Sequence, residues 1–243
     1  MENKYDDSKF FNNYSKMYRS QHGLKGAGEW HVLQKLLPDF KGKKVLDLGC
    51  GYGWHCRYAI ENGASSVTGV DISMKMIEKA KEINNLSNIC YIVSPLEKID
   101  LKRGEYDLVL SSLVFHYIEN LENLFQKIFN FLKDKGKFIF SVEHPIFTAY
   151  GNQDWFYNQK EEKACWPVDN YFYQGKREAI FLGEKVTKYH HTLTGYVSTL
   201  LKAGFVIDNI VEPMPSKEML KEFPEMKEEL RRPMMLIISA QKY

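Results

Sequence analysis

The stretch Val45-Leu46-Asp47-Leu48-Gly49-Cys50-Gly51-Tyr52-Gly53 decides the fold of this 243-residue chain. A short apolar run ends in alternating glycines, and the residues that follow have apolar positions at helical spacing. Glycine lets the backbone turn tightly and approach a ligand closely. The stretch therefore predicts a strand, a glycine-rich turn that faces a ligand, and a helix.

The next apolar run carries a second signal. It ends in Gly69-Val70-Asp71-Ile72, which places a carboxylate at the tip of the neighbouring strand. Such a carboxylate can accept hydrogen bonds from both hydroxyls of a ribose. A nicotinamide-binding fingerprint, G-x-G-x-x-G, would need glycine at position 54, where the chain has Trp54. The two runs together predict an adenosine-binding crevice and argue against a nicotinamide-dependent dehydrogenase.

The rest of the chain alternates short apolar runs with longer amphipathic segments, which is typical of βαβ units. We expect strands at 44–48, 66–70, 89–93, 106–110, 137–142, 205–211 and 234–240. We expect helices at 53–62, 73–84 with Ser73 as N-cap, 120–133 closed by Gly136, 192–202, and 216–230 with a kink at Pro224. The predicted fold is an α/β, Rossmann-like, doubly wound seven-stranded mixed sheet. It is mostly parallel, with an antiparallel terminal strand.

The motif D-x-G-x-G-x-G from Asp47 to Gly53 resembles the first motif of class I S-adenosylmethionine-dependent methyltransferases, and Asp71 resembles their second motif. The resemblance extends over roughly residues 40–143. It implies S-adenosylmethionine as cofactor, with the adenine after the third strand, although Ser94 stands where family members often have Asp. The implied cofactor-binding residues are Tyr18, Arg19, Asp47, Gly49, Cys50, Gly51, Gly53, Asp71, Ile72, Ser94, Pro95, Leu96, Glu97 and Ser111.

Two of these assignments have an alternative. Asp47 lies inside the strand end, so its carboxylate either contacts the ligand or bonds the loop backbone. Arg19 either pairs with the methionine carboxylate of the cofactor or belongs to an amphipathic surface helix. We expect one domain, 1–243. In related methyltransferases the segment before the first strand often folds over the cofactor, so we expect residues 1–40 to form an N-terminal helical cap.

An aromatic insertion interrupts the βαβ pattern at 145–190, and we expect it to form a lid over the acceptor; its aromatics are equally good core material. His116 and His144 follow the fourth and fifth strands, at the sheet edge where ligands bind, and are the candidate general bases. Their alternative role is packing. The pair His190-His191 lacks further ligands at metal-binding spacing, so we expect no metal.

The chemical class of the methyl acceptor is inferred mainly by excluding other classes. The 33 basic and 31 acidic residues are interleaved, which speaks against nucleic acid. Methyltransferases that act on DNA bases, and several that act on protein amides, carry an Asp/Asn-Pro-Pro-Tyr-like motif after the fourth strand. This chain has no such motif there. We expect methyl transfer to a small organic molecule in the cytoplasm, with no membrane partner and with the oligomeric state left open. The alternatives are a cofactor-binding sensor and an enzyme that modifies the cofactor itself.

Overall fold

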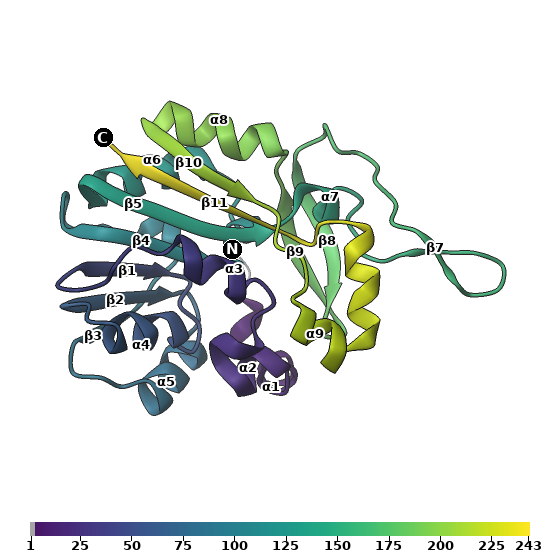
Figure 1. Cartoon of the computed structure of the whole chain (residues 1–243), viewed down its shortest axis with the longest axis horizontal. Helices are drawn as coiled ribbons and strands as arrows, with labels where there is room; N and C mark the ends of the chain where they lie inside the picture. Colours follow the sequence, from purple (N-terminus) through teal and green to yellow (C-terminus); the bar gives the residue numbers. More distant parts are fainter. Residues whose placement is uncertain (1–2) are drawn as a thin grey trace.

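The computed structural model describes residues 3–243, and its centre is one seven-stranded sheet (Figure 1). The strand order is β10-β11-β5-β4-β1-β2-β3, and β11 runs in the direction opposite to that of the other six strands of this sheet. The predicted mixed sheet is therefore confirmed, with β11 inserted between β5 and β10. The strands are β1 (Lys44–Leu48), β2 (Ser66–Asp71), β3 (Ile89–Val93), β4 (Tyr106–Ser112), β5 (Leu132–Glu143), β10 (Phe205–Val211) and β11 (Met235–Lys242).

Helices cover both faces of the sheet, as expected for a doubly wound fold (Figure 1). One face carries α3 (Trp30–Leu36), α4 (Trp54–Glu61) and α5 (Met74–Ile83). The other carries α6 (Leu121–Phe131) and α8 (Leu193–Ala203). Successive side chains of a strand point to opposite faces, so in β1 Leu46 and Leu48 pack towards α6 while Val45 packs towards α4.

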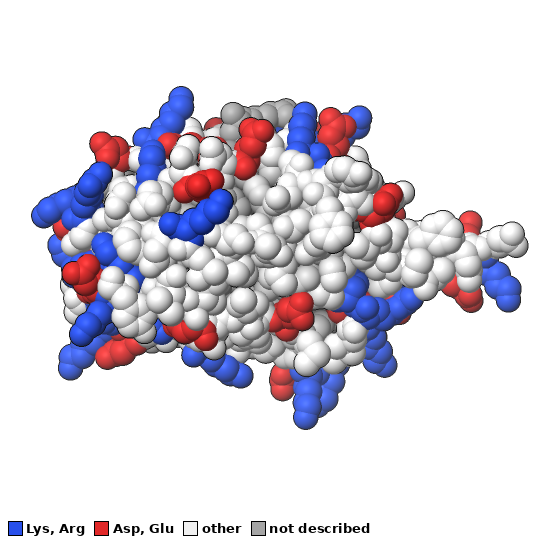
Figure 2. All heavy atoms as spheres, turned by 90° about the horizontal axis from the view of Figure 1, so that it is seen from above, with Lys and Arg blue, Asp and Glu red and all other residues white. Residues whose placement is uncertain are grey.

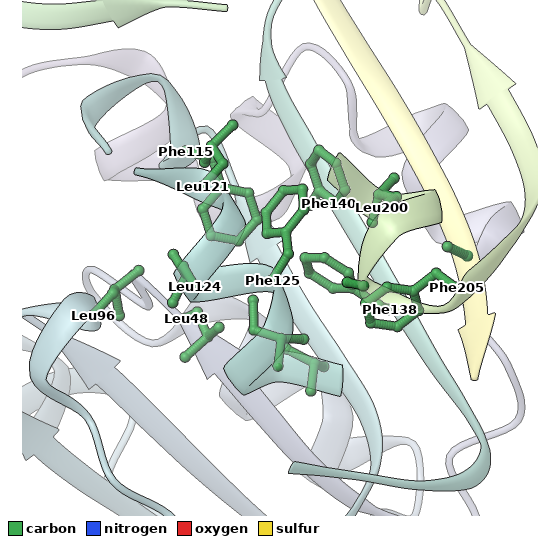
Figure 3. Close-up of a cluster of buried hydrophobic side chains, with 14 of the residues drawn as sticks. Leu48, Leu96, Phe115, Leu121, Leu124, Phe125, Phe138, Phe140, Leu200 and Phe205 are labelled. Atoms are coloured by element: carbon green, nitrogen blue, oxygen red, sulfur yellow. The ribbon is translucent and has the colours of Figure 1, made fainter. Parts of the chain in front are cut away.

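The α6 face is filled by phenylalanine side chains (Figure 3). The Phe115 ring centroid lies 5.3 Å from that of Phe125 and 5.2 Å from that of Phe140, both in edge-on arrangements. Phe115 belongs to the short 3₁₀ helix η4 (Phe115–Tyr117), which directly follows β4. Because Phe115 is fully buried, it anchors η4 and fixes His116 at the carboxyl edge of the sheet.

The largest error in a predicted boundary lies at the junction of α6 and β5. Helix α6 ends at Phe131, and β5 begins at Leu132, five residues before the predicted start at Lys137. Leu132 has extended backbone, pairs with Tyr106 of β4 and is fully buried. Burial in the sheet therefore ends the helix before Gly136 is reached.

The insertion after β5 is built from short elements: α7 (Pro145–Thr148), β6 (Phe156–Tyr157), β7 (Lys163–Cys165), β8 (Gly175–Phe181) and β9 (Glu184–His190). The β6–β7 hairpin projects from the body as an arm (Figures 1 and 2). Its base is held by Arg232, whose guanidinium carbon lies 4.1 Å from the ring centroid of Trp166 and 4.7 Å from that of Phe147.

The N-terminal helices and the segment that precedes β11 lie close together beside the carboxyl edge of the sheet, whereas β11 carries the C-terminus to the opposite edge (Figure 1). The N-terminal segment contains η1 (Lys4–Asp6), α1 (Ser8–Ser15), α2 (Tyr18–His22) and η2 (Gly23–Gly26). Near the C-terminus, α9 (Lys217–Glu222) gives way at Pro224 to η5 (Pro224–Arg231), as predicted. The Tyr18 hydroxyl donates to Glu222 Oε1 at 3.2 Å, which joins α2 to α9.

The surface carries both signs of charge. On the face seen in Figure 2, lysine and arginine side chains are interspersed with aspartates and glutamates. Within residues 3–243, no helix is both long and apolar enough to cross a bilayer.

Candidate functional site

The glycine loop after β1 has a backbone conformation that would be strained in residues that carry a Cβ. Gly49, Gly51 and Gly53 all have positive φ, at 71°, 51° and 75°. A Cβ on Gly49 would lie 2.2 Å from Val114 Cγ2, and one on Gly53 would lie 2.2 Å from the Tyr91 hydroxyl oxygen. A Cβ on Gly51 would meet nothing within 4 Å. The outer glycines therefore serve close packing, while Gly51 faces open space where a ligand fits.

Asp71, at the end of β2, holds this loop. Its Oδ2 accepts a hydrogen bond from the Gly51 amide and its Oδ1 accepts one from the Ser73 amide, both at 2.9 Å. The residue is 8% exposed. Burial raises the pKa of the carboxyl to about 6, although the amide hydrogen bonds act in the opposite direction. Asp71 thus combines a fixed position with a charge that is lost in mildly acidic solution.

The N-terminal segment covers the loop. Ser73 Oγ donates to Asp6 Oδ1 at 2.6 Å, which ties η1 to the start of α5. The Tyr14 ring lies edge-on to that of Tyr52, with centroids 5.7 Å apart. A pocket remains between the loop and these helices. It is lined by Tyr14, Arg19, Ser20, Gly23, Leu24, Ala27, Gly49, Cys50, Gly51, Tyr52, Trp54, His55 and Ser112.

Four lining side chains carry buried polar atoms without a hydrogen-bond partner within the part of the chain that the structure describes. They are Ser20 Oγ, the Tyr52 hydroxyl, Trp54 Nε1 and His55 Nε2. Burial lowers the pKa of His55 to about 4, so this ring is neutral at pH 7. Buried polar groups are normally satisfied. Their grouping around one pocket indicates that a polar ligand belongs there.

Arg19 brings a positive charge to the same pocket. Its Nη2 lies 3.9 Å from Glu29 Oε1, which also accepts a hydrogen bond from Ser112 Oγ at 2.8 Å. Burial acts to raise the pKa of Glu29, but the attraction of Arg19 and the hydrogen bonds to the carboxylate, including that from Ser112, together outweigh it, and the pKa is lowered. The carboxylate therefore stays ionised and fixes the arginine at the pocket, where its guanidinium is placed to bind an anionic group.

Asp47 lies beneath the loop, outside the set of residues that line the pocket. Its Oδ2 accepts from the Cys56 thiol at 3.2 Å, and it is 1% exposed. Burial raises its pKa to about 7. Oδ2 bonds Cys56 of α4, and no hydrogen bond from the loop backbone to the Asp47 carboxylate is found among the described residues. The expected contact of Asp47 with the ligand stays a prediction.

We expect Asp47→Asn to change how stability depends on pH. Between pH 4 and 7 the unfolded chain loses the Asp47 proton while the folded chain keeps it, so rising pH destabilises the native protein. The free energy of unfolding of the variant minus that of the native protein, measured with urea, should therefore rise over this range by roughly 4 kcal/mol, at about 1.4 kcal/mol per pH unit, and stay constant above pH 7. The exposed Asp100→Asn is the control. If the free energies of unfolding of the variant and the native protein differ by the same amount at every pH, Asp47 does not titrate with a raised pKa in the folded protein.

Comparison with known proteins identifies the family. A family model described as a methyltransferase domain matches residues 46–140. A solved structure from Listeria monocytogenes, assigned to the S-adenosylmethionine-dependent methyltransferases, is 52% identical with a TM-score of 0.86, covering 91% of this chain and 99% of its own. The chain belongs to the class I S-adenosylmethionine-dependent methyltransferases. It is an enzyme, and S-adenosylmethionine is its cofactor.

Further relatives extend the match. A methyltransferase structure from Mesorhizobium loti is 39% identical with a TM-score of 0.85, covering 90% of this chain and 100% of its own. An uncharacterized Haemophilus influenzae protein is 35% identical over 98% of this chain and 96% of its own length. A malonyl-[acyl-carrier protein] O-methyltransferase from Priestia megaterium is 28% identical over 58% of this chain and 53% of its own length. This chain thus matches about half of that enzyme.

The structure brings some of the residues predicted to bind the cofactor together. Arg19, Gly49, Cys50 and Gly51 line the pocket. Gly53 precedes α4 in the same loop, and Asp71 bonds the loop. The segment Ser94-Pro95-Leu96-Glu97 follows the adjacent strand β3, and the Ser94 amide donates to the Asp71 carbonyl at 2.9 Å. Ile72 follows Asp71, and its carbonyl accepts a hydrogen bond from the side chain of Asn3.

Other predicted residues lie elsewhere. Tyr18 is 40% exposed and stacks on His22, and it is absent from the pocket lining. Ser111 is fully buried and its hydroxyl donates to the Leu48 carbonyl at 2.8 Å, so its side chain fastens β4 to β1. Sequence reasoning missed Trp54, His55 and Glu29. For Trp54 and His55 the available signal was their place in the first turn after the glycine loop.

His116 lies in a buried polar cluster beside the insertion. Its Nδ1 accepts from the Glu143 amide at 3.3 Å, and its Nε2 lies 3.9 Å from Glu143 Oε1. The same carboxylate accepts hydrogen bonds from Lys188 of β9 at 2.6 Å and from Gln153 at 2.7 Å. Burial lowers the pKa of His116 to about 4. The ring is therefore neutral at pH 7, with its proton on Nε2.

His144 has a different environment. Its Nδ1 accepts from the Ile146 amide at 3.1 Å, which caps α7, and its Nε2 lies 2.9 Å from Glu212 Oε1. Neither histidine lines the pocket at the glycine loop. His190 and His191 bond Tyr171 and Ile118 carbonyls. Among the described residues no group of three or more potential metal ligands converges.

Proposed function

We propose that this enzyme transfers the methyl group of S-adenosylmethionine to a small organic molecule and releases S-adenosylhomocysteine. The observation that carries the proposal is the cover over the glycine loop, where η1 and α1 bond α5 and pack on Tyr52. A site closed by its own chain suits an acceptor that fits inside it better than the surface of a macromolecule. The Priestia relative is named for an O-methyltransferase of a carrier-bound small acid.

The residues that would hold the cofactor are those with suitable donors and acceptors at the loop. Asp71 would accept from the ribose hydroxyls, and Arg19 would bind the methionine carboxylate bidentately. The segment after β3, Ser94 to Glu97, would border the adenine. The residues before 40 act as the cap in this proposal, and residues 145–190 act as the lid over the acceptor.

When bound, S-adenosylmethionine would supply a methyl group on a positively charged sulfur that is already a good leaving group. Little acid–base chemistry is then required of the protein. The cap and Trp54 exclude water, and the Arg19–Glu29 pair fixes the orientation of the carboxylate end. His116 has a low pKa and is a weak base, and both His116 and His144 lie outside the lining of the cofactor pocket, so we assign both histidines a packing role.

The direct test of this function is turnover. Purified enzyme is incubated with S-adenosylmethionine and a panel of small acids, alcohols, amines and thiols, and S-adenosylhomocysteine and methylated product are measured together. Equimolar formation of both supports methyl transfer. Tight cofactor binding without any product would favour a sensor, and conversion of the cofactor without a methylated acceptor would favour cofactor modification.

We expect His116→Ala to lower kcat less than tenfold on whichever acceptor is turned over, because a ring with pKa near 4 contributes little proton transfer at pH 7. The measurement is steady-state kinetics from pH 5 to 9, with His116→Asn as the polar control. A general base would instead cost about 10²–10⁴ in kcat with unchanged cofactor affinity. A loss of that size would restore His116 to a catalytic role.

A further inference from the structure

A second pocket lies directly beside the cofactor pocket. The loop that joins η2 to α3 separates the two, since Ala27 lines the first and the next residue, Gly28, lines the second. We call the second the methionine pocket. Its lining includes Gly28, Glu229 and four of the nine methionines of the chain: Met219, Met226, Met234 and Met235.

The methionine pocket lies at the ligand-binding edge of the sheet. Met235 opens β11 and pairs with Glu143, the last residue of β5, and the Met234 carbonyl accepts from the His144 amide at 2.9 Å. Ser112, which lines the cofactor pocket, ends the neighbouring strand β4. Ligands of open α/β sheets bind outside the carboxyl ends of the strands. The two pockets thus occupy adjacent positions along one edge.

The lining favours an uncharged, flexible ligand. Thioether side chains are unbranched and polarizable and adapt to irregular apolar shapes. All four methionines are only partly buried, so their side chains are accessible from the pocket. The carboxylate of this lining, Glu229, is already paired with the guanidinium of Arg232. An additional ionic group on the ligand would therefore find no unpaired partner among the described lining residues.

We propose that the methionine pocket binds an aliphatic portion of the methyl acceptor, so that the substrate is an amphiphilic small molecule. This rests on the proposed function. The nucleophilic end of the acceptor lies on the Ala27 and Ser112 side, near the cofactor, and its hydrocarbon portion extends past Gly28 between Met219 and Met235. The acceptor class is thus a short aliphatic chain with one polar, methylatable group.

Gly28 offers a matched pair of variants. Its φ lies outside the left-handed region, and a Cβ there would lie 3.6 Å from the Cε atoms of both Met219 and Met235, which is ordinary contact. Gly28→Ala is therefore tolerated and leaves most of the pocket open. Gly28→Leu extends further carbons into it. Met226→Lys places a charge in the same lining, from a residue of η5. It tests the pocket independently if Gly28→Leu does not fold.

The first experiment uses the uncharged fluorophore N-phenyl-1-naphthylamine as probe. We expect the full-length enzyme and Gly28→Ala to bind it with equal Kd within twofold, and Gly28→Leu and Met226→Lys to bind it at least tenfold more weakly. Calorimetric affinity for S-adenosylmethionine should be unchanged in all variants, which also reports that they fold. No probe binding, or equal Kd in all four proteins, would overturn the proposal while leaving the cofactor assignment intact.

The second experiment links the pocket to turnover. Straight-chain acids, alcohols, amines and thiols of two to ten carbons are compared as acceptors. We expect kcat/KM to rise about fourfold per added methylene over the first members in the native enzyme, since a buried methylene contributes about 0.8 kcal/mol. The rise should disappear in Gly28→Leu. An equal rise in both proteins, or no turnover of any member by the native enzyme, would contradict the acceptor class, whereas unchanged cofactor affinity would still support the family function.

Discussion

Asp71→Ala is expected to weaken binding of S-adenosylmethionine 10- to 100-fold, or about 1.5–3 kcal/mol, as expected when hydrogen bonds to a charged group are lost. The variant removes the ribose acceptor and leaves the Gly51 and Ser73 amides without the carboxylate that now fixes them. The measurement is calorimetric titration at pH 7.5. Unchanged affinity would remove Asp71 from the cofactor site.

Two controls separate binding from folding in this experiment. Asp71→Asn keeps the shape and one acceptor, so its affinity should lie between those of the native protein and the alanine variant. The pKa of about 6 adds a pH signature, because protonation removes the charge that the ribose hydroxyls require. Affinity of the native protein should fall as pH drops through 6, and that of Asp71→Ala should change less.

Gly49→Ala is expected to destabilise the fold by about 2–5 kcal/mol. Positive φ costs a residue with a Cβ about 1–2 kcal/mol, and forcing extra carbon into a packed site costs a further 1–3 kcal/mol. Here the added Cβ would overlap Val114 Cγ2 at 2.2 Å. Denaturant unfolding measures the loss, and cofactor binding should be lost with it because the loop must move.

The double variant Gly49→Ala, Val114→Ala identifies the cause. Removing both Cγ atoms of Val114 relieves the overlap but leaves the backbone strain, so the double variant should recover part of the stability lost by Gly49→Ala. Gly51→Ala, whose Cβ meets nothing within 4 Å, should cost less stability and act mainly on binding. Equal stability of Gly49→Ala and the native protein would show that the loop is not packed as described.

The sequence predicts the sheet well because its strands are short, largely apolar runs, and strands at its centre, such as β1 and β4, are buried on both faces. Strands β1, β3 and β10 have the predicted bounds, and Ser73 caps α5 as expected, with its hydroxyl accepting from the Met76 amide. The end of α6 was mispredicted because Leu132 fits a helix pattern and a buried strand equally well. Only its pairing with Tyr106 decides between them.

The site is less predictable because it is assembled from distant segments. The glycine loop and Asp71 are readable from local spacing. The Arg19–Glu29–Ser112 contacts depend on how the N-terminal helices lie against β4. Likewise, the contacts that Glu143 makes with His116 and with Lys188 depend on where the β8–β9 hairpin of the insertion docks. No periodicity in the sequence encodes that docking, so histidines after strands looked equally suited to catalysis and to packing.

The central claim is that the pocket between the glycine loop and the N-terminal cap is built for S-adenosylmethionine. Thermal unfolding with and without ligand tests it most directly, because a ligand of the native state stabilises by about 2.7 kcal/mol at 100 times its Kd. For a chain of this size that corresponds to a rise in Tm of roughly 5–10 °C. We predict that rise with S-adenosylmethionine and S-adenosylhomocysteine, and none with NAD. A rise with NAD and none with either sulfur compound would contradict the account.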